Sequence, residues 1–120
     1  MSKRHEAEAG GLPAAEALDL GGLVAYQDGA IVSRTLVQRG GGTVTLFAFD
    51  RGQALSEHTA PFDALVTVLD GEAELIIGGQ KVAARAGQIV LMPAGVAHAL
   101  HAPQRFKMLL VMVREAAAAK

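Results

Sequence analysis

The chain has 120 residues, of which 51% are hydrophobic and 19% charged, and its formal net charge is -1 at pH 7. This length fits one domain with a single hydrophobic core. The charged residues are too few to cover the surface, so we expect a partner subunit to cover part of it in a homodimer. No basic run follows Lys3 and Arg4, which argues against a nucleic-acid partner.

The sequence contains no cysteine, which excludes disulfides, thiolate metal sites and a cysteine nucleophile. No uninterrupted apolar stretch approaches the roughly 18 residues of a membrane span. Glu8, Glu16 and Asp19 interrupt any apolar core of a signal peptide. We therefore predict a cytoplasmic protein with no membrane span.

The N-terminal residues differ in composition from the rest of the chain. Residues 1–22 are rich in Ala, Glu and Gly, and Pro13 lies among them. We expect a short, poorly ordered arm here, with at most a short helix over 14–19. The folded domain is then expected over 23–115, with a C-terminal tail at 116–120.

From residue 23 on, short runs rich in Val, Ile, Leu and Phe alternate with glycine-containing turns. This pattern is typical of an all-β sandwich or barrel. The best hairpin is LIIGGQKV at 75–82, where two glycines supply the positive φ angles of a tight turn. A second turn is expected at Asp70 and Gly71. The predicted strands cover residues 23–27, 30–38, 43–49, 54–60, 63–69, 72–77, 80–84, 88–92, 97–101 and 106–113.

Two segments carry a resemblance to a known family. Residues 52–71 read GQALSEHTAPFDALVTVLDG and residues 87–102 read GQIVLMPAGVAHALHA. Both resemble the paired motifs of cupins, and the second keeps the glycine, proline and histidine spacing G-x5-P-x-G-x2-H. The resemblance implies a small single-domain cupin related to the RmlC-like proteins, with a jelly-roll barrel (a double-stranded β-helix). It also implies a homodimer with a small ligand pocket.

The resemblance and strand alternation together indicate which side chains face the pocket. The motifs bring His58 and His98 to one mouth of the barrel. Alternation then turns Ser56 and Ala60 inward with His58 and turns Leu100 and Ala102 inward with His98. In the last predicted strand Lys107 faces outward, so the residues that alternate with it face inward. The residues on the same face as Lys107 are available to a partner. The expected pocket residues are His58, His98, Phe47, Phe49, Met108 and Leu110, and Phe106 and Met112 also face inward; Leu109, Val111 and Val113 face outward.

The metal-ligand motif is incomplete. Metal-binding cupins have a second histidine and a glutamate where this chain has Ala60 and Ala64. Only His58 and His98 remain as metal candidates, so no cofactor is certain, and we expect at most a weakly bound Zn, Ni, Fe or Mn ion. A third ligand would have to come from Asp63, His101 or Gln53. Asp63 and His101 have the wrong strand parity on regular strands, although a β-bulge would re-aim Asp63, and Gln53 lies near the other end of its strand.

Three hypotheses for function remain open. The first is a dimeric module that binds a small molecule, with sugars as one class of ligand. The second is a metal-dependent enzyme of dioxygenase, isomerase or decarboxylase type that uses His58 and His98. The third is a regulatory role in association with another protein. Fold alone does not decide among them, because cupins host unrelated functions.

Overall fold

The computed structural model describes residues 5–7 and 11–114. Within these residues the chain forms nine strands and one short 3-10 helix, so the all-β prediction is confirmed. Their bounds are β1 His5–Ala7, η1 Leu20–Leu23, β2 Ile31–Arg39, β3 Gly42–Phe49, β4 Ala54–His58, β5 Asp63–Ile77, β6 Gln80–Arg85, β7 Ile89–Met92, β8 His98–His101 and β9 Phe106–Val113. None of the described helices is long and apolar enough to cross a membrane.

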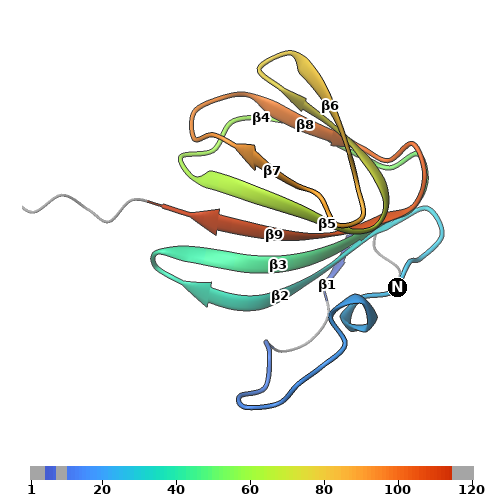
Figure 1. The fold of residues 1–120 in the computed structure, drawn as a ribbon, viewed down its shortest axis with the longest axis vertical. Coiled ribbons are helices and arrows are strands. Elements are labelled where there is room, and N and C mark those ends of the chain that lie inside the picture. The colour runs from blue at the N-terminus through green and yellow to red at the C-terminus, as the bar shows by residue number, and fades with distance from the viewer. Residues whose placement is uncertain (1–4, 8–10, 115–120) are drawn as a thin grey trace, which may run out of the picture.

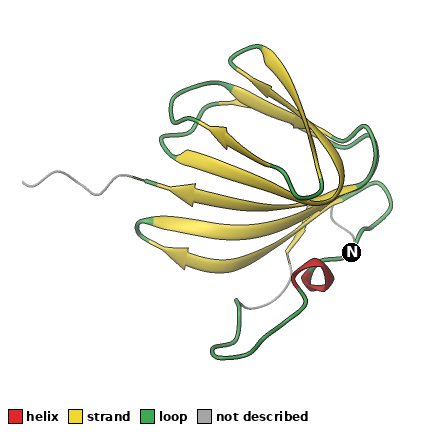
Figure 2. Cartoon of the chain, in the orientation of Figure 1, coloured by secondary structure: helices red, strands yellow, loops and turns green. Residues whose placement is uncertain are grey.

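Strand β5 connects two curled sheets. Residues 63–71 of β5 pair with β7 and β9, and residues 72–77 pair with β6 and β8. One sheet therefore has the order β1-β2-β3-β9-β5-β7 and the other has the order β6-β5-β8-β4. Figures 1 and 2 show the two sheets curling toward each other around a common interior. This is the predicted jelly-roll barrel.

Two of the sequence predictions about strands are wrong. Residues 23–27 form no strand, because η1 and a loop occupy this part of the chain. The strands predicted over 63–69 and 72–77 are one continuous strand, β5, so Gly71 makes no turn. Its φ of 75° bends the strand instead. A Cβ at Gly71 would collide with the carbonyl oxygen of Arg105, so glycine is needed here for close packing of β5 against β9.

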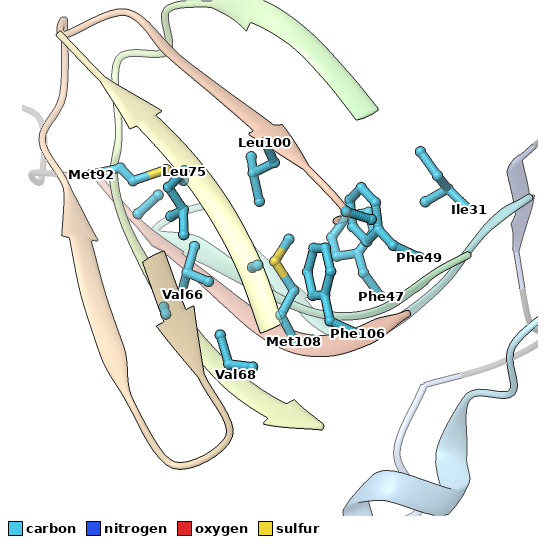
Figure 3. Close-up of a cluster of buried hydrophobic side chains, with 14 residues drawn as sticks. Ile31, Phe47, Phe49, Val66, Val68, Leu75, Met92, Leu100, Phe106 and Met108 are labelled. Carbon is cyan, nitrogen blue, oxygen red and sulfur yellow. The ribbon is translucent and has the colours of Figure 1, made fainter. Parts of the chain in front are cut away.

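The interior is filled by side chains from both sheets, as Figure 3 shows. The rings of Phe49 and Phe106 stack with their centroids 4.5 Å apart, and the ring of Phe47 lies 6.0 Å from that of Phe49. Register places Phe49 opposite Phe106, at one end of β3 and β9. These rings fill that end of the barrel, which we call the closed end. The other end of the same two strands, where Thr43 lies opposite Met112, is the open end.

A second apolar cluster lies on the outer face of β2 and β3. The segment around η1 packs over it with Leu23, Val24 and Tyr26. The Tyr26 hydroxyl donates to Asp70 Oδ2 at 2.6 Å, and Lys107 Nζ donates to the Gly21 carbonyl at 2.7 Å. Leu109 also packs against this cluster, so the chain itself covers part of the surface that was assigned to a partner.

Arg105 ties three loops together near the closed end. Its guanidinium donates from Nε to Asp50 Oδ1 at 2.8 Å and from Nη2 to Asp28 Oδ1 at 2.6 Å. The Gly29 amide donates to the other oxygen of Asp50 at 2.6 Å. The hydrogen bonds from Arg105 and Gly29 lower the pKa of Asp50 from 3.8 to about 2. Asp50 is half-buried, but Arg105 and Asp28 are exposed, so this network positions loops more than it stabilises the core.

The described part of the N-terminal arm contains β1, which pairs in parallel with β2, and η1. The helix considered over 14–19 is absent; a turn occurs at residues 14–15. The predicted tail at 116–120 lies outside the described residues. The domain boundaries at 22 and 115 stay predictions.

Candidate functional site

The two candidate histidines lie opposite each other on adjacent strands. His58 ends β4 and His98 begins β8. In the antiparallel pairing of these strands the two residues are directly opposite each other. A tight corner precedes His98. Its Gly95 has a φ of 78°, and the Gly95 amide donates to the Ala60 carbonyl at 2.9 Å. The corner therefore attaches the start of β8 to the segment that follows β4.

A small cavity at the open end contains both imidazoles. Its volume is about 60 Å³. His98 is 5% exposed and forms part of the wall, whereas His58 is exposed at the rim. The remaining lining is apolar and comes from both sheets: Leu55, Ala60, Ala64, Met92, Leu100, Met108, Leu110 and Met112.

Hydrogen bonds to the backbone orient both rings. His58 Nδ1 lies 2.9 Å from the Ser56 carbonyl oxygen, and His98 Nδ1 lies 3.2 Å from the Val96 carbonyl oxygen. A carbonyl oxygen only accepts, so each neutral ring carries its proton on Nδ1 and has a lone pair on Nε2. The ring centroids are 4.5 Å apart at an interplanar angle of 70°. Neither Nε2 has a hydrogen-bond donor among the described residues.

The environment keeps His98 neutral. Burial lowers the pKa of His98 below its usual value, and the nearby His58 acts in the same direction, while the Val96 carbonyl opposes both. At neutral pH His98 therefore presents an unprotonated Nε2. Such a nitrogen accepts a hydrogen bond or coordinates a metal ion.

The structure brings together part of the predicted pocket. Met108 and Leu110 line the cavity with the two histidines, but Phe47 and Phe49 do not. The two phenylalanines lie in the core at the closed end, because strand alternation fixes the face of a residue and not its position along the barrel.

The facing predicted for β4 is wrong at one residue. Leu55 lines the cavity with His58, whereas Ser56 does not. The pairing of β4 with β8 is irregular between Leu55 and His58, and a bulge of this kind reverses the alternation of side chains. Leu100 lines the cavity as predicted, and Ala102 is buried in the core behind it.

None of the three considered extra ligands lines the cavity. Asp63 Oδ1 accepts a hydrogen bond from the Ala94 amide at 2.9 Å. His101 Nδ1 lies 3.5 Å from Glu74 Oε1, and its side chain is 42% exposed. Gln53 lies near Ala102, whose amide donates to the Gln53 carbonyl at 2.9 Å. All three have structural partners away from the imidazoles.

The residues present do not fit the four-ligand metal site of metal-binding cupins. Ala60 and Ala64 do line the cavity, so methyl groups occupy the places of the missing ligands. No group of three or more histidine or acidic residues able to hold a metal occurs among the described residues. Catalytic zinc usually takes three protein ligands, and non-haem iron takes two histidines and a carboxylate. The two Nε2 atoms alone fall short of both.

Sequence reasoning did not assign Leu55 and Met92 to the pocket. No sequence pattern reveals the bulge that turns Leu55 inward. Met92 lies opposite Ala64 in the pairing of β7 with β5 and so shares its face, but this register is a non-local property that the sequence does not display.

A jelly-roll barrel with two motif histidines at one mouth defines a protein of the cupin class. The Cupin domain family matches residues 45–114, which is more than half of the chain. The chain therefore belongs to the cupin family.

Several solved structures resemble this chain. A conserved protein of unknown function from Streptococcus pyogenes is 42% identical, with a TM-score of 0.85 and coverage of 90% of this chain and 95% of that one. A cupin superfamily protein from Desulfitobacterium hafniense is 29% identical, with a TM-score of 0.82 and coverage of 90% and 99%. A predicted oxalate decarboxylase from Thermotoga maritima, 15% identical over 71% of this chain and 81% of that one, has a TM-score of 0.67 and shares the fold alone. No curated protein matches the chain significantly.

Proposed function

We propose that this cupin is a binding module for a small molecule, held at the open end by His58 and His98. One observation carries the proposal: two imidazoles line an otherwise apolar cavity, and no described residue donates to either Nε2 atom. A mostly apolar cavity with a few convergent polar groups is the usual form of a small-molecule site, and these acceptors match a ligand with hydrogen-bond donors.

The size of the cavity limits what enters it. Typical small-molecule sites measure about 300–1,000 Å³, whereas this cavity measures about 60 Å³. Only one end of a ligand, such as a hydroxyl or hydroxymethyl group, fits in the cavity against the imidazoles. Sugars, with many hydroxyl donors, are the ligand class we favour.

The test is a thermal-shift screen of monosaccharides and polyols followed by calorimetry. We expect a hit whose affinity falls at least tenfold in His58→Ala and in His98→Ala. The matched control is His101→Ala, which removes an exposed histidine of the same strand as His98 and should leave affinity unchanged. A ligand that binds the double variant His58→Ala/His98→Ala as well as the parent would contradict the proposal.

A metal-dependent enzyme is the second candidate. The observation that favours it is the pair of Nδ1 contacts to carbonyl oxygens, the arrangement that usually orients metal-ligating histidines. Elemental analysis of protein purified without a tag or chelator tests it. A stoichiometric metal that is lost in His58→Ala would support this candidate, and metal-free protein that still binds its ligand would exclude it.

We also infer a homodimer formed through the outer face of the β7-containing sheet. Ile89 is 61% exposed and Leu91 is 52% exposed. Register places Leu91, Leu65 and Val111 side by side on this face, next to Val44. Exposed apolar rows of this kind favour a second copy as the cover. Sedimentation that shows only a 12.4 kDa species at micromolar concentration would contradict the dimer. A cytoplasmic location stays a prediction.

A further inference from the structure

A second, larger cavity lies next to the histidines and is not used by the proposed function. Its volume is about 280 Å³. Eight residues line it: Gln38, Arg39, Gly40, Gly42, Thr43, Phe62, Met112 and Arg114. Met112 is the one residue that belongs to both linings.

The strand register shows that the two cavities share one face of the sheet. Gln38 of β2 lies opposite Thr43 of β3, and Thr43 lies opposite Met112 of β9. Met112 in turn lies opposite Ala64 of β5, and Ala64 lies opposite Met92 of β7. Directly opposite residues share a face, so these five side chains form one row across the interior face at the open end. The row runs from the second cavity to the histidine cavity.

Two arginines and no acidic side chain are found among the described residues that line the second cavity. Arg39 Nη1 donates to the Gln38 carbonyl at 2.8 Å, and the Arg114 guanidinium carbon lies 4.6 Å from the centre of the Phe62 ring. Among the described residues neither arginine forms an ion pair. Each guanidinium has five N–H donors, so most of these donors have no partner among the described residues. The described lining therefore has a net positive charge.

One lining residue, Thr43, carries a buried hydroxyl. Thr43 Oγ1 has no hydrogen-bond partner among the described residues. Because this oxygen is closed to solvent in the structure, the arginines, and not the hydroxyl, supply the donors that a ligand in the cavity meets.

The backbone holds the two arginines near each other. The Arg114 amide donates to the Gly41 carbonyl at 3.0 Å, which joins the end of β9 to the turn that follows Arg39. A Cβ at Gly42 would collide with the Met112 carbonyl oxygen, so glycine is required for this close approach of β3 and β9. Arg39 thus ends β2, and Arg114 follows directly after β9 and is tied to the neighbouring turn by a backbone hydrogen bond.

We propose that this cavity binds the carboxylate or phosphate group of a small organic anion through Arg39 and Arg114. Planar guanidiniums bind such oxyanions by paired hydrogen bonds. This proposal rests on the function proposed above and adds an acidic group to its ligand. The acidic group occupies the second cavity, and the rest of the molecule extends over Met112 toward the imidazoles. The flexible thioether of Met112 can adapt to such a ligand.

The test uses inorganic phosphate and acetate as separate probes in amide NMR titrations of the full chain, with sodium chloride added to keep ionic strength constant. We expect saturable shifts at Thr43, Phe62 and Arg114 with at least one probe, and the stronger probe identifies the acidic group. The double variant Arg39→Gln/Arg114→Gln should weaken binding at least tenfold. The matched control is Arg85→Gln, an exposed arginine at the end of β6 that does not line the cavity.

Two outcomes would overturn the inference: no saturable shift in the parent with either probe, or equal binding in the arginine double variant. The variant His58→Ala/His98→Ala separates this inference from the proposed function. If this histidine variant still binds the anion, and no ligand from the screen loses affinity when the histidines are replaced, the proposed function fails and the anion site stands. If it loses the anion as fully as the arginine variant does, the anion lies on the imidazoles and this inference fails.

Discussion

The two ends of the barrel are built from the same strands but differ in how their polar groups are paired. At the closed end, Phe49 and Phe106 stack inside while Arg105 binds two carboxylates outside. At the open end, the Nε2 atoms of two histidines and the Thr43 hydroxyl have no partner among the described residues. We therefore expect stability to be concentrated at the closed end, and we propose that binding takes place at the open end.

The largest effect is expected at the closed end. Phe106→Ala removes a fully buried ring and should lower the free energy of unfolding by about 3–5 kcal/mol in urea denaturation. The matched change at the open end is Met112→Ala, which truncates a half-buried side chain and should cost less than half as much. Equal losses at the two ends would contradict the comparison.

Removing both candidate histidines should have a smaller effect on the free energy of unfolding. We expect His58→Ala/His98→Ala to fold and to lose at most about 1–2 kcal/mol of unfolding free energy, the scale of the hydrogen bonds removed. Circular dichroism and urea denaturation measure this. A double variant that fails to fold would reveal a structural role for the histidine pair, such as a metal that supports the fold.

The smallest effect concerns the Arg105 network at the closed end and appears as a pH dependence. The folded pKa of Asp50 is lowered from 3.8 to about 2, so its stabilising contribution is present above pH 3.8 and is lost as the pH falls through about 2. Asp50→Asn should therefore be less stable than the parent at neutral pH, and the difference should shrink over this acid range. A difference that stays constant down to pH 2 would show that the charge of Asp50 is not responsible.

The fold could be predicted from sequence because its signals are local. Glycines at tight turns and alternating apolar residues give nearly all of the strands, and the motif spacing gives the class. The prediction of a strand at 23–27 was wrong because an apolar loop resembles a strand in composition. The apolar residues of this loop cover the outer face of a sheet. The prediction of a turn at Gly71 was wrong because the sequence does not distinguish a glycine required for close packing from a glycine required for a turn.

The site was less predictable because it depends on register and position along the barrel. Alternation correctly gives the inward face of β9, yet it does not distinguish Phe47 at the closed end from Leu110 at the cavity. Arg39 and Arg114 are 75 positions apart in the chain. Only the pairing of β2, β3 and β9 brings these arginines to one cavity, and that pairing is a non-local property.

The position of β9 has a consequence for how the chain folds. This strand lies between β3 and β5, although both precede it in sequence. Until β9 is inserted, β3 and the first part of β5 each present a row of unpaired backbone groups, the kind of edge that pairs with other chains. Because such non-local pairing is slow, we expect refolding to be limited by the docking of β9 and aggregation to compete with that step. Chaperone dependence should therefore be greatest before residues 106–113 are in place.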